Sequence, residues 1–389
     1  MSAPQPEKFL NETKMRYCSK CLIPDTKPYL EFDKEGVCSA CRTHELKKDS
    51  DTGVNWPERK KEFEELIVWV KAQNAPWYDV LVPVSGGKDS ITQVHRLLNH
   101  GLRILAVNVD YGIKTDIGIR NLACVPRMGA SLSVYRPELS LHTRLIRIGY
   151  EDFGDPDLLS HTLLYAYPLH VALRFSVPLV LLGENSAFEY GGAEKLATQN
   201  SITRDWFSKY VANSGRDPAF ISAQYGIPIE NLRLYDFPDE IETNEQTKAL
   251  YLSYFFPWDS EEHLNIAKNY GFESLKDPGE GTYRNYVGID EKINRIHQYF
   301  KVLKFGYGRA TDHACEDIRL GRMDREQAKD LVRKHDLAPL SEDYVTEFCE
   351  FIGISNPRFH EIQEKFRNLD IWHQEASGKW TIRDHLVGS

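Results

Sequence analysis

The sequence predicts an α/β protein built on a doubly wound parallel sheet of five strands, with a cysteine-rich module before it and a mainly helical region after it. Three observations indicate this fold. Apolar stretches of strand length alternate with helical patterns in the middle of the chain, two CxxC pairs stand near its beginning, and amphipathic patterns fill its last third. We set the domain boundaries at residues 1–55, 56–275 and 276–389, with an insertion at about 196–245.

The composition is that of a globular protein, with 389 residues of which 41% are hydrophobic and 27% charged. A net charge of −9 argues against nucleic acid as the main partner, because such binding depends on neutralising phosphates. No apolar run approaches the ~18 residues of a membrane helix. The first fourteen residues form a polar leader without the hydrophobic region of a signal peptide, so we expect a cytoplasmic protein that does not enter the membrane.

The first module carries two CxxC pairs with sixteen residues between them, namely Cys18, Cys21, Cys38 and Cys41. This spacing indicates a structural zinc site, because each pair presents two thiolates to one ion and four thiolates close the tetrahedron. Turn residues between the pairs predict a small β-ribbon. The alternatives are buried free thiols or an iron–sulfur cluster on the same ligands.

The first strand of the predicted sheet, Val80–Val84, leads into a loop and then into a helix from about Ile91 to Asn99. The loop residues are Ser85, Gly86, Gly87, Lys88, Asp89 and Ser90. Adjacent glycines let backbone N–H groups approach an anion, and the following helix adds the positive end of its dipole. The lysine supplies a cation and the aspartate an oxygen ligand for magnesium. The loop therefore predicts a polyphosphate site rather than an ordinary corner, although it lacks the Walker pattern.

Further strands are predicted at residues 102–110, 130–137, 177–185 and 250–258, with helices at 58–73, 115–129 and 161–176. In the helix at 115–129, Thr115 is the expected cap, Gly129 the expected stop, and Pro126 the expected break or kink. Because ligands of such sheets bind at the carboxyl ends of the strands, Asp110 and Gly183 join the predicted nucleotide site. Glu184 is a second candidate magnesium ligand beside Asp89. For Glu189, a functional role and a solvated loop have equal weight. The insertion predicts a lid or substrate wall.

The segment KFGYGRATDH, residues 304–313, places two glycines around a tyrosine, followed by Arg309, Asp312 and His313. A local excess of basic residues suits a phosphorylated small substrate. A helix junction with solvated charges is an equal alternative. Ser341 and Asn356 are expected to begin two further amphipathic helices.

The loop SGGKDS after a strand resembles the PP-loop of the ATP pyrophosphatase superfamily. Together with the CxxC pairs, GENSAFEYGG and KFGYGRATDHACEDIRLGRM, it makes the chain resemble the N-acetyl sugar amidotransferases from about Arg16 to Trp372. These are PP-loop enzymes of bacterial surface-polysaccharide (lipopolysaccharide O-antigen) synthesis. The resemblance implies a PP-loop (adenine nucleotide α-hydrolase-like) sheet and an ATP-dependent, AMP-forming reaction. An acetamido group of a UDP-linked 2,3-diacetamido uronic acid, or of a precursor of nine-carbon sialic-like sugars, would become an acetamidino group.

The implied cofactors are ATP, Mg²⁺ and structural Zn²⁺. Lys88 and the loop N–H groups would take the charge of pyrophosphate, Asp89 and Glu184 would hold magnesium, and Arg309 would hold the sugar nucleotide. Glu184 and His313 are candidate proton acceptors.

Cys124, Cys315 and Cys349 lie in no nucleophile elbow, so we expect a separate glutaminase subunit with a cyclase-like ammonia-channel subunit, as the resemblance also implies. The alternatives are a tRNA-thiolating PP-loop enzyme and a non-catalytic nucleotide sensor that docks through its zinc module.

Overall fold

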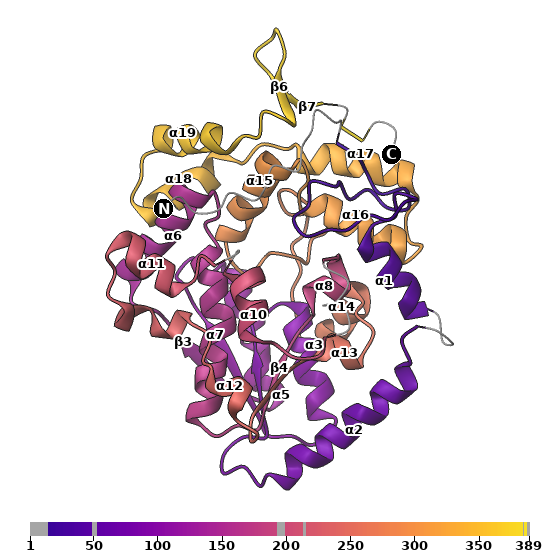
Figure 1. Cartoon of the computed structure of the whole chain (residues 1–389), viewed down its shortest axis with the longest axis vertical. Helices are drawn as coiled ribbons and strands as arrows, with labels where there is room; N and C mark the ends of the chain where they lie inside the picture. Colours follow the sequence, from indigo (N-terminus) through magenta and orange to yellow (C-terminus); the bar gives the residue numbers. More distant parts are fainter. Residues whose placement is uncertain (1–14, 49–52, 193–198, 213–214, 384, 387–389) are drawn as a thin grey trace.

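A computed structural model describes residues 15–48, 53–192, 199–212, 215–383 and 385–386 of the chain. The sheet and its helices form one half of the molecule, and the C-terminal helices lie over the other half together with the N-terminal segment (Figure 1). The predicted N-terminal leader and residues 49–52, near the end of the first predicted domain, lie outside the described residues. None of the described helices has both the length and the hydrophobicity needed to span a bilayer.

The central sheet has five parallel strands in the order β3-β2-β1-β4-β5. The strands are β1 (Val80–Pro83), β2 (Ile104–Val109), β3 (Ser131–Tyr135), β4 (Leu179–Leu182) and β5 (Lys248–Tyr251). The predicted doubly wound parallel sheet is thereby confirmed. Strand order reverses between β1 and β4, so the loops after these two strands diverge and leave a crevice at the carboxyl edge.

Helices cover both faces of the sheet because side chains alternate along each strand. Val80 and Val82 of β1 pack with α2 (Trp56–Ala72), α3 (Lys88–Leu98) and α5 (Cys124–Met128). Leu81 packs on the opposite face with α7 (Leu158–Arg174), which runs unbroken through Pro168. Two apolar layers therefore fix the position of the carboxyl edge.

Several predicted boundaries are wrong for identifiable reasons. The helix after the loop begins at Lys88 instead of near Ile91, because Gly87 is its N-cap. The predicted strand at residues 250–258 combines the end of β5 with the short helix α13 (Leu252–Phe255), which is equally aromatic. The predicted β-ribbon is limited to two isolated bridges, Tyr17 with Pro24 and Phe32 with Cys38, before α1 (Ser39–Lys48).

The predicted helix at residues 115–129 is two helices, α4 (Asp116–Leu122) and α5. Thr115 caps the first and Gly129 ends the second in the left-handed conformation, as predicted. The break falls at Ala123 rather than at Pro126, because proline is tolerated in the first turn of a helix. Likewise, Ser355 and not Asn356 caps α19 (Asn356–Phe366).

The described part of the insertion is mainly helical. Its elements are α10 (Arg204–Trp206), the π-helical η1 (Phe207–Val211), α11 (Pro218–Tyr225), the 3₁₀ helix η2 (Ile229–Tyr235) and α12 (Glu240–Thr243). Buried Trp206, Phe207 and Phe237 anchor it in the same core as α7. It therefore forms a fixed wall beside the sheet.

The remaining elements include those of the last third of the chain, which confirm that this region is mainly helical. They are α6 (Leu139–Phe153), α8 (Ser186–Tyr190), α14 (Ser260–Lys268), α15 (Ile293–Phe305), α16 (Arg309–Arg319), α17 (Arg325–Asp336), α18 (Glu342–Ile352), α19 and a hairpin of β6 (Trp372–Gln374) and β7 (Trp380–Ile382). Ser341 caps α18 as predicted. The sequence prediction lacked the hairpin.

The two ends of the described chain share one core. The four cysteines pack with Ala314, Ala328 and Val332 of α16 and α17, and the N-terminal segment runs among these helices in Figure 1. Met15 packs with residues of α15, α18 and α19. The cysteine module is thus buried by the C-terminal helices, and it contributes a wall to the site described next.

Candidate active site

The loop after β1 leaves an exposed helix N-terminus at the carboxyl edge. Gly86 has φ +93°, and a Cβ there would lie 2.8 Å from the backbone nitrogen of Leu122, so only glycine fits. Gly87 caps α3 without a side chain, which leaves the first N–H groups of this helix without a side-chain acceptor. A helix end of this kind attracts an anion such as a phosphate.

Lys88 and Asp89 form an ion pair at the start of α3. Lys88 Nζ lies 2.7 Å from Asp89 Oδ2, and His263 Nδ1 lies 2.8 Å from Asp89 Oδ1. Burial acts to raise the pKa of Asp89, but the charge of Lys88 and the hydrogen bond with His263 hold it well below its ordinary value. Asp89 is therefore an ionised carboxylate suited to a cation.

Glu184 approaches the same place from the end of β4, across the crevice. Burial raises its pKa to about 7, and the nearby negative charge of Asp89 adds to the rise. Two carboxylates that repel each other beside a phosphate-binding loop fit a Mg²⁺ ion, which prefers oxygen ligands. Asp89 and Glu184 are the residues that would hold it.

Two cavities meet at this point. The first, of about 350 Å³, lies between the loop, the end of β2 and the segment 286–291. The second, of about 530 Å³, lies between the loop, the N-terminal module, the insertion, α15 and α16. We call the residues that line both cavities the junction: Lys88, Asp89, His161, Glu184, Val287, Asn294 and Arg309.

The first cavity combines apolar and polar walls. Val109, Ile113 and Leu164 offer a surface for a flat base. Lys114 Nζ donates a hydrogen bond to Asn108 Oδ1 at 2.7 Å on the same wall. The loop residues Ser85 and Gly87 close the end at the helix N-terminus. This arrangement suits a nucleotide with its phosphates at α3.

The second cavity is lined by charged and aromatic side chains, with four basic residues (Lys27, Lys88, Lys301, Arg309) and four acidic ones (Asp89, Glu184, Asp312, Glu316). Lys27 and Lys301 both pair with Asp312, so positive charge is in excess at this one point, and Lys27 Nζ donates to the carbonyl of Tyr190 at 2.7 Å. Aromatic side chains complete the lining, namely Tyr29, Trp206, Tyr210 and Tyr307.

Three buried polar atoms of the second cavity's lining residues have no hydrogen-bond partner among the described residues. They are Arg309 Nε, Gln298 Oε1 and Tyr210 Oη. Buried polar groups are normally satisfied, so these atoms indicate a polar ligand in this cavity.

The motif GYGRATD builds the turn that presents Arg309. The carboxylate of Asp336 accepts hydrogen bonds from the N–H groups of Gly308, Ala310 and Thr311 and from the Thr311 hydroxyl. A Cβ on Gly308 would lie 2.5 Å from Asp336 Oδ1, which explains this glycine. Arg309 then reaches the junction, where its Nη2 donates to Asn294 Oδ1 at 2.6 Å.

Other predicted site residues line neither cavity. Ser90 donates its hydroxyl to the carbonyl of Gly87, and Gly86 serves the turn. Asp110 pairs with Arg136, with 2.7 Å between Oδ2 and Nε. Gly183 packs where a Cβ would lie 2.9 Å from Gln93 Nε2. These positions support the site's backbone without facing it.

Glu189 and His313, whose roles the sequence left open, have different positions relative to the site. Glu189 forms a buried ion pair with Lys47, with 2.6 Å between Oε2 and Nζ, which ties α8 to α1. His313 lines the second cavity, and its Nδ1 lies 2.8 Å from the hydroxyl of Thr282. Burial and neighbouring cations lower its pKa well below the ordinary value, so its imidazole is neutral.

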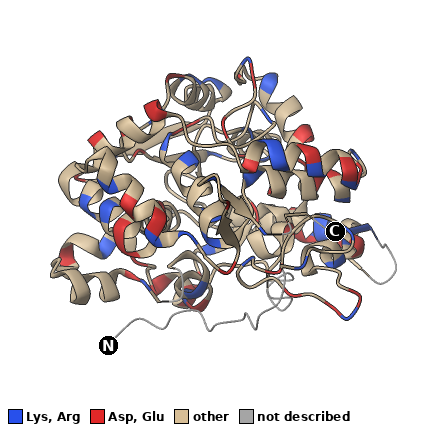
Figure 2. Ribbon diagram, turned by 90° about the horizontal axis from the view of Figure 1, so that it is seen from above, with Lys and Arg blue, Asp and Glu red and all other residues tan. Residues whose placement is uncertain are grey.

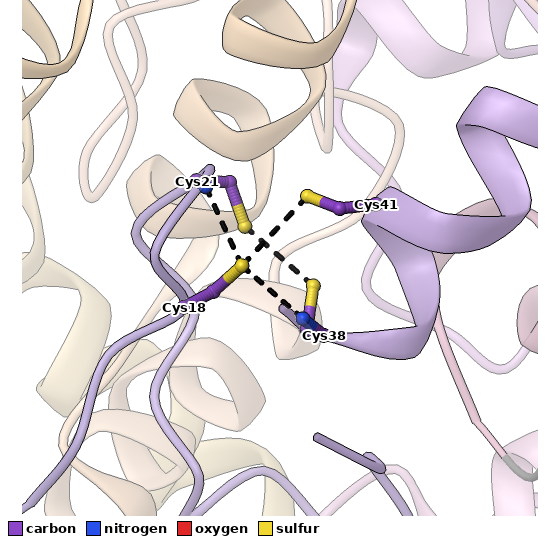
Figure 3. A group of neighbouring side chains, drawn as sticks. All are labelled: Cys18, Cys21, Cys38 and Cys41. Carbon is purple, nitrogen blue, oxygen red and sulfur yellow. Dashed lines mark hydrogen bonds between the residues drawn. The ribbon is translucent and has the colours of Figure 1, made fainter. Parts of the chain in front are cut away.

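The four cysteine side chains point toward one centre (Figure 3). The Sγ atoms of Cys18 and Cys41 are 3.9 Å apart, those of Cys21 and Cys38 are 3.7 Å apart, and all four lie within 4.8 Å of one another. Zn–S bonds of about 2.3 Å in a tetrahedron place sulfurs roughly 3.8 Å apart. The buried donor set therefore fits one zinc ion with no open position.

The sequence prediction missed several residues of the site. Lys27 and Tyr29 come from the cysteine module, and His263 reaches Asp89 from α14. Nothing in their local patterns signals this, because tertiary packing brings them in. Asp157 and His161 of the first cavity lie in and just after the sequence DPD, a pattern that is not specific enough to indicate a site.

Comparison with known proteins adds a family match in the last third of the chain. Residues 280–386 match the C-terminal domain of WbpG-like lipopolysaccharide biosynthesis proteins. No curated protein matches the chain. Among solved structures, an NMN synthetase from Francisella tularensis aligns with 12% identity over 57% of this chain and 98% of its own, with a TM-score of 0.27. So low a TM-score supports no conclusion about fold, which rests on the strand order above. The segment that supplies Arg309 and one wall of the second cavity is thus similar to a domain of lipopolysaccharide biosynthesis proteins.

Proposed function

We propose that this protein is an ATP-dependent amidotransferase acting on a nucleotide-linked sugar. It would adenylate the N-acetyl carbonyl oxygen of a UDP-linked 2,3-diacetamido uronic acid, or a related sugar, and use ammonia to form an acetamidino group with release of AMP and pyrophosphate. The observation that carries the proposal is the junction, where a phosphate-binding loop and two carboxylates separate a nucleotide-sized cavity from a second cavity with charged and aromatic walls.

The first step needs an amide oxygen in line with the α-phosphorus of ATP. The N-terminus of α3 and Lys88 bind the β- and γ-phosphates and stabilise the charge that develops on departing pyrophosphate. Magnesium bound at Asp89 and Glu184 would neutralise phosphate charge. Adenylation turns the oxygen of a poor electrophile into a leaving group, since AMP now departs with it. Ammonia then attacks the imidate carbon.

The second cavity supports a nucleotide sugar as the acceptor. Arg309 and Lys301 supply positive charge for a diphosphate or carboxylate, and the aromatic wall offers stacking surfaces for a base or a sugar ring. The match of residues 280–386 to WbpG-like lipopolysaccharide biosynthesis proteins supports a surface-sugar precursor. Because ATP and sugar nucleotides are cytoplasmic substrates, we propose that location for the reaction.

Ammonia is proposed to come from a separate glutaminase subunit through a cyclase-like channel subunit. Cys124, Cys315 and Cys349 are buried, and none of them lines either cavity. Within the described residues, therefore, no thiol stands beside the junction to attack glutamine there. Release of ammonia from glutamine by the purified chain alone would contradict this proposal.

The absence of a cysteine from the described lining residues of both cavities also weighs against tRNA thiolation, which generally uses reactive cysteines at the site. Basic and acidic positions are also interspersed on the helices in view (Figure 2), whereas a tRNA-binding surface needs a basic patch. A nucleotide sensor without catalysis would have no need for the Lys88–Asp89–Glu184 group beside a second cavity.

A product assay tests the proposal. Purified protein would receive Mg-ATP, ammonium chloride and a panel of UDP-diacetamido sugars, followed by chromatography with mass detection. We expect AMP, pyrophosphate and a sugar in which NH has replaced one oxygen. ADP in place of AMP would contradict the phosphate chemistry, and AMP formation only with tRNA and a sulfur donor would favour thiolation.

A further inference from the structure

A group of carboxylates and histidines includes one junction residue, His161, and has no part in the mechanism above. It consists of Asp155, Asp157, His161, Glu291 and His297, and we call it the carboxylate–histidine cluster. His297 Nδ1 lies 2.9 Å from Asp155 Oδ1, and the two imidazole rings are 5.6 Å apart. His161 lines both cavities, so the cluster opens onto the place where the acceptor would be activated.

Asp157 is the unusual member. It is only 2% exposed and lines the first cavity, yet its Oδ1 has no hydrogen-bond partner among the described residues. Its Oδ2 is 3.9 Å from His161 Nε2 and 4.0 Å from His297 Nδ1. Leaving a buried carboxylate oxygen unsatisfied is costly, so a ligand that donates hydrogen bonds is expected here.

An ordinary structural role does not explain Asp157. It stands at the N-cap of α7, where aspartate normally accepts hydrogen bonds from the first turn. Its backbone is helical, with φ −88° and ψ −7°, and its side chain makes no capping bond. The carboxylate is therefore held toward the cavity instead of toward the helix that it precedes.

The cluster is negative and suits a small cation. In the described part of the chain, the basic side chains within 4.0 Å of the carboxylates of Asp155 and Asp157 are histidines, with no lysine or arginine among them. The pKa of Glu291 is raised well above its ordinary value by burial and then by Asp157 and Asp290. Among the described residues, only the four cysteines bring three or more metal-ligating side chains within 4.8 Å of one another. The spacing in the carboxylate–histidine cluster therefore favours a cation that donates hydrogen bonds over a metal ion.

We propose that Asp157 and His161 form the binding site for the ammonium ion that supplies the transferred nitrogen. This inference rests on the proposed function. Asp157 Oδ1 accepts one N–H of the ion, and His161, with its Nε2 unprotonated, takes one proton and frees the nitrogen lone pair. The pair forms the C–N bond to the imidate carbon, the C–O bond breaks, and its electrons leave with AMP. The protonated amidine keeps the remaining hydrogens, and His161 releases its proton to solvent.

Substitution of Asp157 separates nitrogen binding from acceptor activation. In the full chain, we expect Asp157→Asn to raise the KM for ammonium chloride about tenfold, because a charge-assisted hydrogen bond is lost. Exchange of labelled pyrophosphate into ATP, which reports adenylation of the sugar without ammonia, should match that of the control Asp330→Asn. Asp330 carries the same charge on the exposed face of α17, with 86% of its side chain accessible.

A second variant keeps the proposal testable if Asp157→Asn fails to fold. The side chain of His161 is 40% exposed to the cavities, so His161→Asn should fold and show the same rise in KM with normal exchange. If both variants kept the native KM for ammonium while the enzyme turned over, the ammonium site would be refuted and the proposed function would stand.

A binding measurement that needs no turnover completes the test. Rb⁺ is close to ammonium in size, and its anomalous scattering is visible in crystals soaked in a rubidium salt. We expect a peak against Asp157 Oδ1 in the native protein and none in Asp157→Asn. If a rubidium peak were found but the protein formed no AMP, the cation site would be supported and the proposed function would be refuted. Absence of a peak from native crystals would overturn the inference.

Discussion

Asp336 and Asp157 are each 2% exposed, but their carboxylates differ in how fully their hydrogen bonds are satisfied. Asp336 accepts four hydrogen bonds at the start of α16, close to the shared core that holds the four cysteines. Asp157 leaves one oxygen unsatisfied beside the junction. The first region is closed, since its polar groups satisfy one another, and the second is open, since its groups are left for ligands. Hydrogen bonding, rather than burial, distinguishes stabilising from ligand-binding residues here.

The largest expected effect is loss of the closed metal cluster. Cys38→Ser removes one of four ligands, and we expect loss of zinc and a fall of at least about 5 kcal/mol in the free energy of unfolding, because metal binding is coupled to folding. Elemental analysis and urea denaturation would measure both. Cys349→Ser makes the same chemical change at a buried thiol outside the cluster and should retain zinc. Full zinc content in Cys38→Ser would break the comparison.

In the open region, Lys88→Met should abolish activity without a matching loss of stability. We expect AMP formation to fall about 1,000-fold, because the cation that stabilises departing pyrophosphate is removed. Asp89 keeps its hydrogen bond with His263, so the unfolding curve should change little. A loss of activity no larger than the loss of folded protein would instead place Lys88 with the closed region.

Asp336→Ala should lower the stability of the protein. It leaves the N–H groups of Gly308, Ala310 and Thr311 without their acceptor, and we expect a loss of about 2–4 kcal/mol in the free energy of unfolding. Asp330→Ala, on the exposed face of the same helix, is the matched control and should be nearly neutral. Equal stability of the two variants in urea denaturation would show that the hydrogen bonds of Asp336 do not support the fold.

The smallest expected effect is a gain in stability on substitution of Glu184. The pKa of Glu184 is raised to about 7 in the folded protein, so folding favours its protonated form, and stability is lost as pH rises from the unfolded pKa through about 7. In magnesium-free buffer at about pH 8, Glu184→Gln should increase the free energy of unfolding by about 1–2 kcal/mol. The difference in stability between the two proteins should vanish at about pH 4. This pH lies below the pKa of Glu184 in both the folded and the unfolded state, so the carboxyl is mostly protonated in both. A variant less stable at both pH values would contradict the assignment.

Local patterns in the sequence were sufficient for the sheet and for part of the site. The apolar strands, the cap at Thr115 and the stop at Gly129 depend on residues close in the chain, and the structure confirms them. Lys88 and Asp89 could be identified because the loop that holds them is continuous. Glu184 followed from the rule that parallel strands bring their carboxyl ends together.

Residues brought in by distant packing could not be predicted. Asp157 and His161 lie near the predicted helix at residues 161–176, but only the cavity reveals that a carboxylate oxygen is left over. Lys27 belongs to a module predicted to be structural, and it lines the second cavity because α16 and α17 bury that module. The start of α3 was misplaced because glycine caps a helix without a side-chain signal.

The shared core of the chain's two ends sets an order of events during synthesis. Cys41 emerges from the ribosome early, whereas Val332, which buries the cluster, lies 291 residues later (332 − 41). At about 5–20 residues per second, the interval is roughly 15–60 s. Throughout it the thiols are exposed to metal ions and oxidants, and contacts of such high sequence separation form slowly. Metal loading thus has a time window during translation, and a pause before α17 would lengthen it.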